Sequence, residues 1–173
     1  MTQGLRRGCS LITALATLGP VGKCPIAPGT AGTLVGFAAY FFLCDAKILL
    51  DYVYWMTCLA LPLLAVPICH AAEKSLGRED PSEIVLDEFS VIPLCFMGTL
   101  MPSRISSMEA APLLAWLAAG FVLFRFFDVC KPLGIRASQR LSNGWGVVLD
   151  DVLAAVCTCG CLNLGWRWFG WGA

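Results

Sequence analysis

Residues 52–72 read YVYWMTCLALPLLAVPICHAA, a run of 21 residues without a single Asp, Glu, Lys or Arg. An α-helix rises about 1.5 Å per residue, so a helix of this length crosses the roughly 30 Å hydrocarbon core of a bilayer. Residues 24–44 form a second uncharged stretch of the same length. Two such stretches in a chain of 173 residues predict an integral membrane protein.

The composition of the whole chain agrees with a membrane environment. Of its residues, 58% are hydrophobic and 14% are charged, whereas soluble domains carry about 25% charged residues. So few charges cannot cover a globular surface in water, which leaves lipid to cover the rest. The 12 acidic and 12 basic residues cancel, and this balance argues against a nucleic-acid partner. The length suits a single domain over residues 1–173.

Three shorter uncharged stretches follow, at residues 89–103, 110–124 and 152–166. Each would give about 22 Å of helix and needs its flanking residues to complete a crossing. We therefore expect an all-α, polytopic membrane bundle with four to five transmembrane helices. Residues 9–18 are too short to span a membrane, and they predict a short interfacial or re-entrant helix near the N-terminus.

The distribution of Lys and Arg predicts the orientation of the chain. If the N-terminus is cytoplasmic and all five stretches cross, nine of the 12 basic residues lie on the cytoplasmic side and three on the other. Nine of the 12 acidic residues fall on the same cytoplasmic side. Because both signs of charge gather beside membrane-buried helix ends, we expect an active site at the cytoplasmic face. A transporter or channel, the main alternative, would distribute its charges across the membrane depth.

Four clusters on that side could carry chemistry. The first is PGTAGT, residues 28–33, which precedes a helix that we expect to start near Ala31. Its backbone N–H groups and the hydroxyls of Thr30 and Thr33 would suit a phosphate. The same motif is typical of a glycine-rich cap and of close helix packing, which are the simpler explanation of the motif on its own.

The second cluster is EIVLDEF, residues 83–89, in which Asp87 and Glu88 directly precede an apolar stretch. Carboxylates at the mouth of a membrane helix are costly unless they bind something, although acids near a helix N-terminus also stabilise the helix dipole. In the third cluster, Arg125 and Asp128 stand three residues apart on one helical face. A structural ion pair is the alternative explanation for these two residues.

The fourth cluster is GWGVVLDD, residues 144–151, where two adjacent carboxylates begin the last apolar stretch. One acid suffices for a helix cap, so the second points to another role. Oxygen ligands suit Mg²⁺, and Arg and Lys suit phosphoryl oxygens. The combined set predicts phosphate hydrolysis by a metal-activated water. Its members are Asp87, Glu88, Asp128, Asp150, Asp151, Arg125 and Lys131.

Residue counts exclude several other phosphate chemistries. The single histidine, His70, cannot serve a two-histidine lipid phosphatase, and we expect it at a helix end. The chain has no Walker A sequence and no DxDx[TV] motif. Cys130 to Arg136 match the C-x5-R pattern of cysteine-dependent phosphatases, but Cys130 follows an apolar helix and Pro132 removes a backbone donor, which favours a chance match. Most of the ten cysteines lie in apolar runs and none forms a CxxC pair, so we expect neither disulfides nor a zinc site.

Together these motifs resemble the phosphatidylglycerophosphatase A family of bacterial membrane lipid phosphatases. The matching stretches occur in the order of the family and cover nearly the whole chain. The FRxFDxxKP stretch followed by LDDV is the specific part, and the PGTxGT element alone is weaker. The stretches are APGTAGTLVG from Ala27, EIVLDEF from Glu83, FRFFDVCKPLGI from Phe124 and GWGVVLDDVLAA from Gly144.

The resemblance implies a Mg²⁺-dependent enzyme of the bacterial inner membrane that converts phosphatidylglycerophosphate to phosphatidylglycerol and phosphate at the cytoplasmic face. It implies that Asp87, Glu88, Asp128, Asp150 and Asp151 bind the metal and activate water. It further implies that Thr30, Thr33, Arg125 and Lys131 hold the substrate phosphate.

The chain departs from the family pattern at two places. Ser90 and Val91 stand where the family usually has a glycine after its Asp-Glu pair, and Gly134 stands where it usually has a second proline. These departures leave two alternatives open, a phosphatase of another phospholipid phosphomonoester and a catalytically inactive membrane subunit of the same fold. The sequence carries no signal of oligomeric state.

Overall fold

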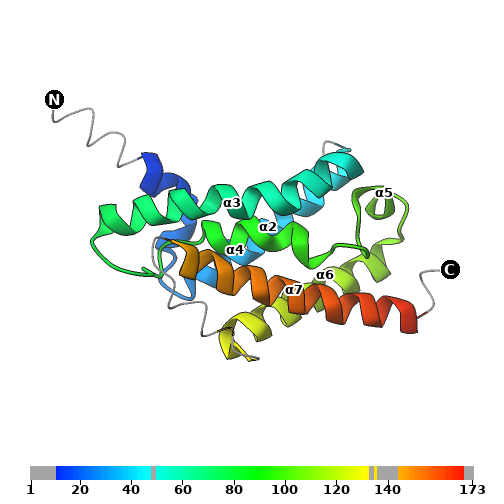
Figure 1. Cartoon of the computed structure of the whole chain (residues 1–173). Helices are drawn as coiled ribbons and strands as arrows, with labels where there is room; N and C mark the ends of the chain where they lie inside the picture. The colour runs from blue at the N-terminus through cyan, green and yellow to red at the C-terminus, as the bar shows by residue number, and fades with distance from the viewer. Residues whose placement is uncertain (1–10, 48–49, 133–134, 136–143, 170–173) are drawn as a thin grey trace.

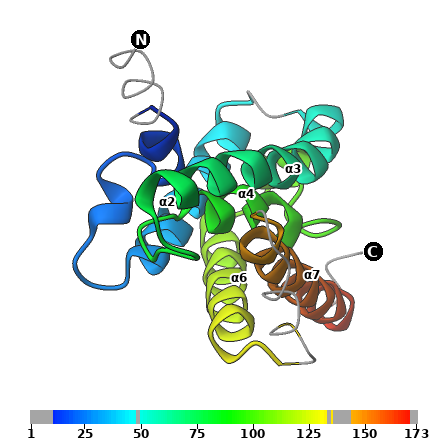
Figure 2. The ribbon, with the colours of Figure 1, turned by 60° about the vertical axis from the view of Figure 1, so that its left-hand side comes forward.

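The computed structural model describes residues 11–47, 50–132, 135 and 144–169, and within these ranges the chain is helical without any strand. A short central helix, α4 (Leu86–Cys95), is packed between α2 (Pro28–Asp45), α3 (Asp51–Leu76) and α7 (Trp145–Trp168). Helix α6 (Ala110–Cys130) closes the bundle against α7 and α2. Figures 1 and 2 show α4 in the interior of this arrangement from two directions. The shorter elements include η1 (Val21–Lys23), α5 (Pro102–Ile105) and the helical residues 11–16.

Three of the described helices, α3, α6 and α7, are long and apolar enough to cross a membrane, by length and composition. They have 26, 21 and 24 residues, which correspond to about 39, 31 and 36 Å. Both α6 and α7 continue well past the uncharged stretches at residues 110–124 and 152–166, so their charged flanks are part of the helices. The all-α prediction is confirmed, while the number of four to five spans stays a prediction.

The prediction that residues 89–103 form one continuous membrane-spanning helix is wrong. Helix α4 has only 10 residues, about 15 Å, and it ends inside the bundle two residues after Pro93, whose ring removes a helical N–H donor. The chain then turns at Gly98, with φ 85°, before α5 begins. Phe96 and Leu100, on either side of this turn, are fully buried. Non-helical backbone is tolerated at membrane depth only where protein surrounds it, as here.

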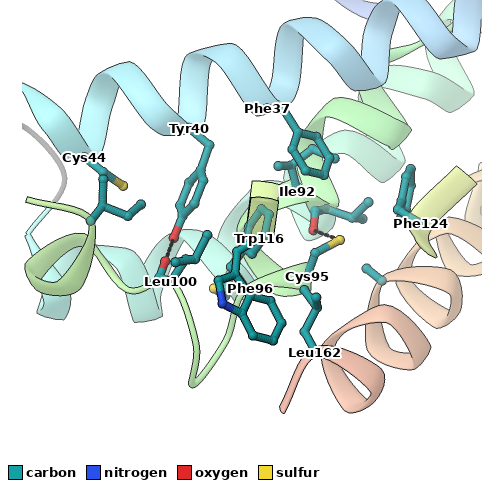
Figure 3. Packing of buried hydrophobic residues seen from close by; sticks show 14 of the residues in the cluster. Phe37, Tyr40, Cys44, Ile92, Cys95, Phe96, Leu100, Trp116, Phe124 and Leu162 are labelled. Atoms are coloured by element: carbon teal, nitrogen blue, oxygen red, sulfur yellow. Dashed lines mark hydrogen bonds between the residues drawn. The ribbon is translucent and has the colours of Figure 1, made fainter. Parts of the chain in front are cut away.

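The backbone carbonyl groups at the end of α4 accept hydrogen bonds from side chains of four other helices. These bonds add to the few backbone hydrogen bonds at the interrupted end of the helix, where the carbonyl of Pro93 also accepts from the N–H group of Phe96 at 3.2 Å. Figure 3 shows the contact from α2, in which the hydroxyl of Tyr40 reaches the carbonyl of Leu100. The bonds run from Tyr54 to Pro93 (2.9 Å), from Asn163 to Met97 (2.7 Å), from Arg104 to Gly98 (2.7 Å) and from Tyr40 to Leu100.

A row of glycines brings α2 into close contact with the start and middle of α4. A Cβ atom at Gly32 would lie 2.6 Å from Cβ of Val85, and one at Gly36 would lie 2.7 Å from Cγ1 of Ile92. Neither position has room for a side chain, which is how small residues allow membrane helices to approach. The packing explanation of the PGTAGT stretch is therefore confirmed.

Five chain segments meet at one end of the bundle because of the directions in which the helices run. The starts of α2, α4 and α7 and the ends of α3 and α6 all lie there (Figure 1). The expected short N-terminal helix is present as helical residues 11–16, and it packs at the same end. Ala16 is fully buried there, and the hydroxyl of Thr13 lies 3.2 Å from that of Ser75 in α3. This end holds the predicted site.

Replacing Tyr54 with Phe tests the role of the hydrogen bonds at the break. The hydroxyl of Tyr54 is fully buried and donates to Pro93, so we expect its removal to lower the free energy of unfolding by about 1 kcal/mol. Tyr52→Phe is the matched control, because Tyr52 is 70% exposed. The measurement is reversible unfolding of both variants in detergent micelles, and equal effects of the two changes would contradict this account.

Candidate active site

A polar pocket of about 250 Å³ opens at the end of the bundle where the five segments meet. Its wall comes from α2, α4, α6, α7 and the loop between α3 and α4. The structure brings all seven of the predicted charged residues together on this wall. They are Asp87, Glu88, Arg125, Asp128, Lys131, Asp150 and Asp151.

The helix positions of these residues differ between the clusters. Asp87 and Glu88 lie in the first turn of α4, so their carboxylates also stabilise its dipole, as the sequence allowed. Asp150 and Asp151 lie more than one turn inside α7, which begins at Trp145. A capping role is therefore excluded for this second pair, and a buried pair of acids inside an apolar helix needs another explanation.

Arg125 joins three of the helices in one polar network. Its Nη1 atom lies 2.8 Å from Oδ2 of Asp128 and 3.0 Å from Oε1 of Glu88, and it donates to Oγ1 of Thr33 at 3.3 Å. The hydroxyl of Thr33 lies 3.0 Å from Oε2 of Glu88. A Cβ atom at Gly29 would lie 2.2 Å from Oε1 of Glu88. The predicted ion pair within α6 is present, and it extends through Glu88 to α2.

Lys131 forms a second network at the end of α6. It caps this helix in the left-handed conformation, with φ 44°. Its Nζ atom contacts Oδ2 of Asp150 and lies 4.0 Å from Oδ1 of Asp128. Burial lowers the pKa of Lys131, but the hydrogen bond to Asp150 and the surrounding carboxylates outweigh burial, so that the pKa is raised. Lys131 therefore stays charged at neutral pH.

Asp87 and Asp151 differ from the other carboxylates of the pocket. Asp87 is 6% exposed and Asp151 is 3% exposed, and within the described ranges neither residue forms an ion pair. The Oδ1 atom of Asp87 is buried and has no hydrogen-bond partner among the described residues. Buried carboxylates without compensation are costly, so this part of the pocket is suited to a cation.

A divalent metal fits this donor set in a particular way. Among the described residues, no three His, Cys, Asp or Glu side chains form a preformed metal cage. Mg²⁺ commonly binds through one or two carboxylates, keeps several waters and completes its coordination with substrate phosphate. The unpartnered oxygen of Asp87 and the nearby carboxylate of Asp151 suit that mode of binding.

The two predicted threonines do not line the pocket. Thr33 is fully buried and contacts Glu88 and Arg125, and Thr30 is half-buried. Pro28 and Gly29 form the part of the wall that comes from α2, which begins earlier than expected, at Pro28. Direct phosphate contact by the threonines stays a prediction, and the observed role of Thr33 is to position two charged side chains.

The sequence analysis missed Asp80 and Ser82, which line the same pocket from the loop between α3 and α4. A signal was available, because this acid stands next to Pro81 in the polar segment that leads into Asp87. An exposed loop acid is common in any protein, however, and only the fold shows that this loop turns back over the pocket.

Several smaller expectations can be compared with the structure. His70 lies inside α3, six residues before the helix ends at Leu76, so the expected helix-end placement is wrong; its Nδ1 atom is 3.9 Å from Oε2 of Glu73. Cys130 is exposed and absent from the pocket wall, and Arg136 and Gly134 lie outside the described residues. The hydroxyl of Ser90 donates to the backbone carbonyl of Asp87 at 2.8 Å, so this departure from the family pattern fits within α4.

Comparison with known proteins identifies one matching family and several similar proteins. The sequence profile of the family described as phosphatidylglycerophosphatase A matches residues 14–166. The chain is similar to phosphatidylglycerophosphatase A of Escherichia coli (32% identity, 85% of this chain and 79% of the relative) and of Haemophilus influenzae (37%, with 75% and 73%). It is also similar to a Bacteroides thetaiotaomicron protein provisionally named phosphatidylinositol-3-phosphatase (36%, with 78% and 80%). No solved structure matches the chain.

Replacing Arg125 with Gln tests the central network. The change leaves the half-buried Glu88 without its cation and leaves Asp128 with only the more distant Lys131, so we expect the free energy of unfolding to fall by about 3 kcal/mol. Arg78→Gln is the control, because its ion pair with Glu83 is largely exposed and should contribute less than about 1 kcal/mol. Unfolding of both variants in detergent measures the difference, and a similar small loss in both would refute a structural role for Arg125.

Proposed function

The chain belongs to the phosphatidylglycerophosphatase A family, and on this premise we propose that it hydrolyses the phosphate monoester of phosphatidylglycerophosphate to give phosphatidylglycerol and inorganic phosphate. The observation that carries the proposal is the pocket in which two cations and six carboxylates meet at one end of an apolar helical bundle. Such a set can bind a phosphomonoester and balance its charge.

Mg²⁺ is the cofactor of the proposed reaction. Asp87 and Asp151 would hold it, because they are the buried carboxylates of the pocket without a cationic partner among the described residues. This assignment narrows the predicted set of five ligands to two. When bound, Mg²⁺ supplies charge neutralisation at the phosphoryl oxygens and lowers the pKa of a coordinated water. Glu88, Asp128 and Asp150 would instead orient the two cationic side chains that they contact.

Arg125 and Lys131 would bind the phosphoryl oxygens of the substrate. Within the described ranges, the contacts of Arg125 all involve Nη1, which leaves donors on Nη2 and Nε for a ligand. Lys131 carries three N–H donors and stays charged beside Asp150. Hydrolysis forms a bond from water oxygen to phosphorus and breaks the bond from phosphorus to the glycerol oxygen, which leaves with a proton. Both cations would stabilise the charge on the phosphoryl group during this transfer.

The cytoplasmic face of the bacterial inner membrane is the proposed location of the site. Lys23, Lys74, Arg78, Arg125 and Lys131 belong to segments at the pocket end of the bundle. Lys47, Arg104 and Arg167 belong to segments at the opposite end. This excess of basic residues supports a cytoplasmic pocket under the positive-inside rule. The absence of charged residues from the middle of the described helices argues against a transport pathway.

Phosphatidylinositol 3-phosphate is the second candidate substrate. The Bacteroides relative, provisionally named for that lipid, shares 36% identity with the chain. Both lipids present a phosphomonoester on a polyol head group, and the two cations of the pocket would recognise that shared chemistry. A substrate panel therefore has to contain both lipids.

The test is phosphate release from both lipids by the purified chain in detergent, with Mg²⁺ and with EDTA. We expect release from phosphatidylglycerophosphate to require Mg²⁺ and to fall roughly 100-fold or more in Asp151→Asn, because a metal ligand is lost. Cys130→Ser is the control and should keep full activity, since Cys130 is exposed and outside the pocket.

Each other outcome has a definite meaning. Phosphate release in the presence of EDTA would refute the metal dependence. Loss of activity in Cys130→Ser would support a cysteine-dependent phosphatase mechanism. Release from the inositol lipid alone would replace the proposed substrate with the second candidate. No release from either lipid by well-folded protein would support the inactive-subunit alternative.

A further inference from the structure

The loop between α3 and α4 brings one more carboxylate to the pocket. Asp80 lies on the pocket wall together with Asp87 and Asp151, from a different part of the chain. Asp80 is exposed to solvent, whereas the other two residues are buried. It is therefore an acid of the pocket that remains accessible from outside the bundle.

The loop holds Asp80 in one backbone conformation. Its φ angle is 46°, in the left-handed region that residues with a side chain seldom adopt. Its N–H group donates to Oε1 of Glu73 at 2.9 Å, and an ion pair of 2.7 Å between Arg78 and Glu83 spans the loop on either side of it. Backbone conformations of this kind persist where the surroundings impose them, and they cluster at ligand sites.

Asp80 adds a negative charge to a pocket that already holds five other carboxylates. Asp80 shares the pocket wall with Asp87 and Asp150, and like charges that line one pocket repel one another. Within the described part of the chain, Arg125 and Lys131 pair with other carboxylates, and no cation pairs with Asp80. The buried Oδ1 atom of Asp87 also lacks a hydrogen-bond partner there. A divalent cation would balance these charges together.

We propose that Asp80 is a third acidic residue of the divalent-cation site. Asp80, Asp87 and Asp151 do not form a preformed metal cage, so Asp80 would act with the two buried carboxylates through the water shell of the cation. The inference rests on the proposed function for the presence of a cation. Mg²⁺ accepts carboxylates directly or through its own waters, so an exposed loop carboxylate is a suitable partner for two buried ones. Glu73 is then a positioning residue, because its carboxylate holds the N–H group of Asp80.

The experiment measures Mn²⁺ binding to the purified full-length chain in detergent by electron paramagnetic resonance. Asp80→Asn keeps the shape of the side chain and removes its charge, and we expect it to weaken Mn²⁺ binding by roughly 10- to 100-fold. Glu79→Gln is the matched control. It removes the same charge from the same loop, but Glu79 does not line the pocket, so its Mn²⁺ affinity should equal that of the wild type.

A second readout separates a role at the cation from a role at the substrate. In Asp80→Asn, the Mg²⁺ concentration for half-maximal phosphate release should rise, and saturating Mg²⁺ should restore most of the rate. Unchanged Mn²⁺ affinity in Asp80→Asn would overturn the inference, and a raised KM for the lipid would then place Asp80 at the head group. Wild-type protein that binds no Mn²⁺ would overturn the cation site as a whole. Intact Mn²⁺ binding without phosphate release would overturn only the proposed substrate.

Discussion

The structure depends on satisfying the backbone of a helix that stops in the middle of an apolar bundle. Helix α4 ends two residues after Pro93, and side chains from α2, α3, α5 and α7 donate to the carbonyls at that break. Unsatisfied carbonyls would be very costly at membrane depth, so these bonds keep α4 short and fixed. Because α4 is held at its end, its first turn can carry Asp87 and Glu88 to a constant place at the pocket.

The pocket itself is organised by the pairing of charges. Arg125 and Lys131 each bring carboxylates from different helices to one point, which joins α2, α4, α6 and α7. This pairing leaves Asp87 and Asp151 buried and without a cation among the described residues. One part of the pocket is thus electrically balanced, while the other carries surplus negative charge. Under the proposed function, the balanced part would receive the phosphate and the negative part the metal.

Much of this arrangement was predictable from the sequence because charged residues inside apolar helices are rare. The uncharged stretches predicted the helical class, and the charged residues beside them predicted which side chains would meet. The interruption of α4 was missed because residues 89–103 contain no charge and differ from a span only by Pro93 and Gly98. The sequence also could not predict that Thr33 is buried or that the loop with Asp80 turns back over the pocket. Both depend on contacts between segments far apart in the chain.

The position of Asn163 has a consequence for how the protein is made. This residue lies in α7, the last described helix, yet it donates to the carbonyl of Met97 at the end of α4. The same helix also supplies Asp150 and Asp151. During synthesis, the helices that precede α7 enter the membrane before the break can be completed, because one donor has not yet been translated. The pocket therefore cannot form before α7 has been made, because this helix supplies two of its carboxylates.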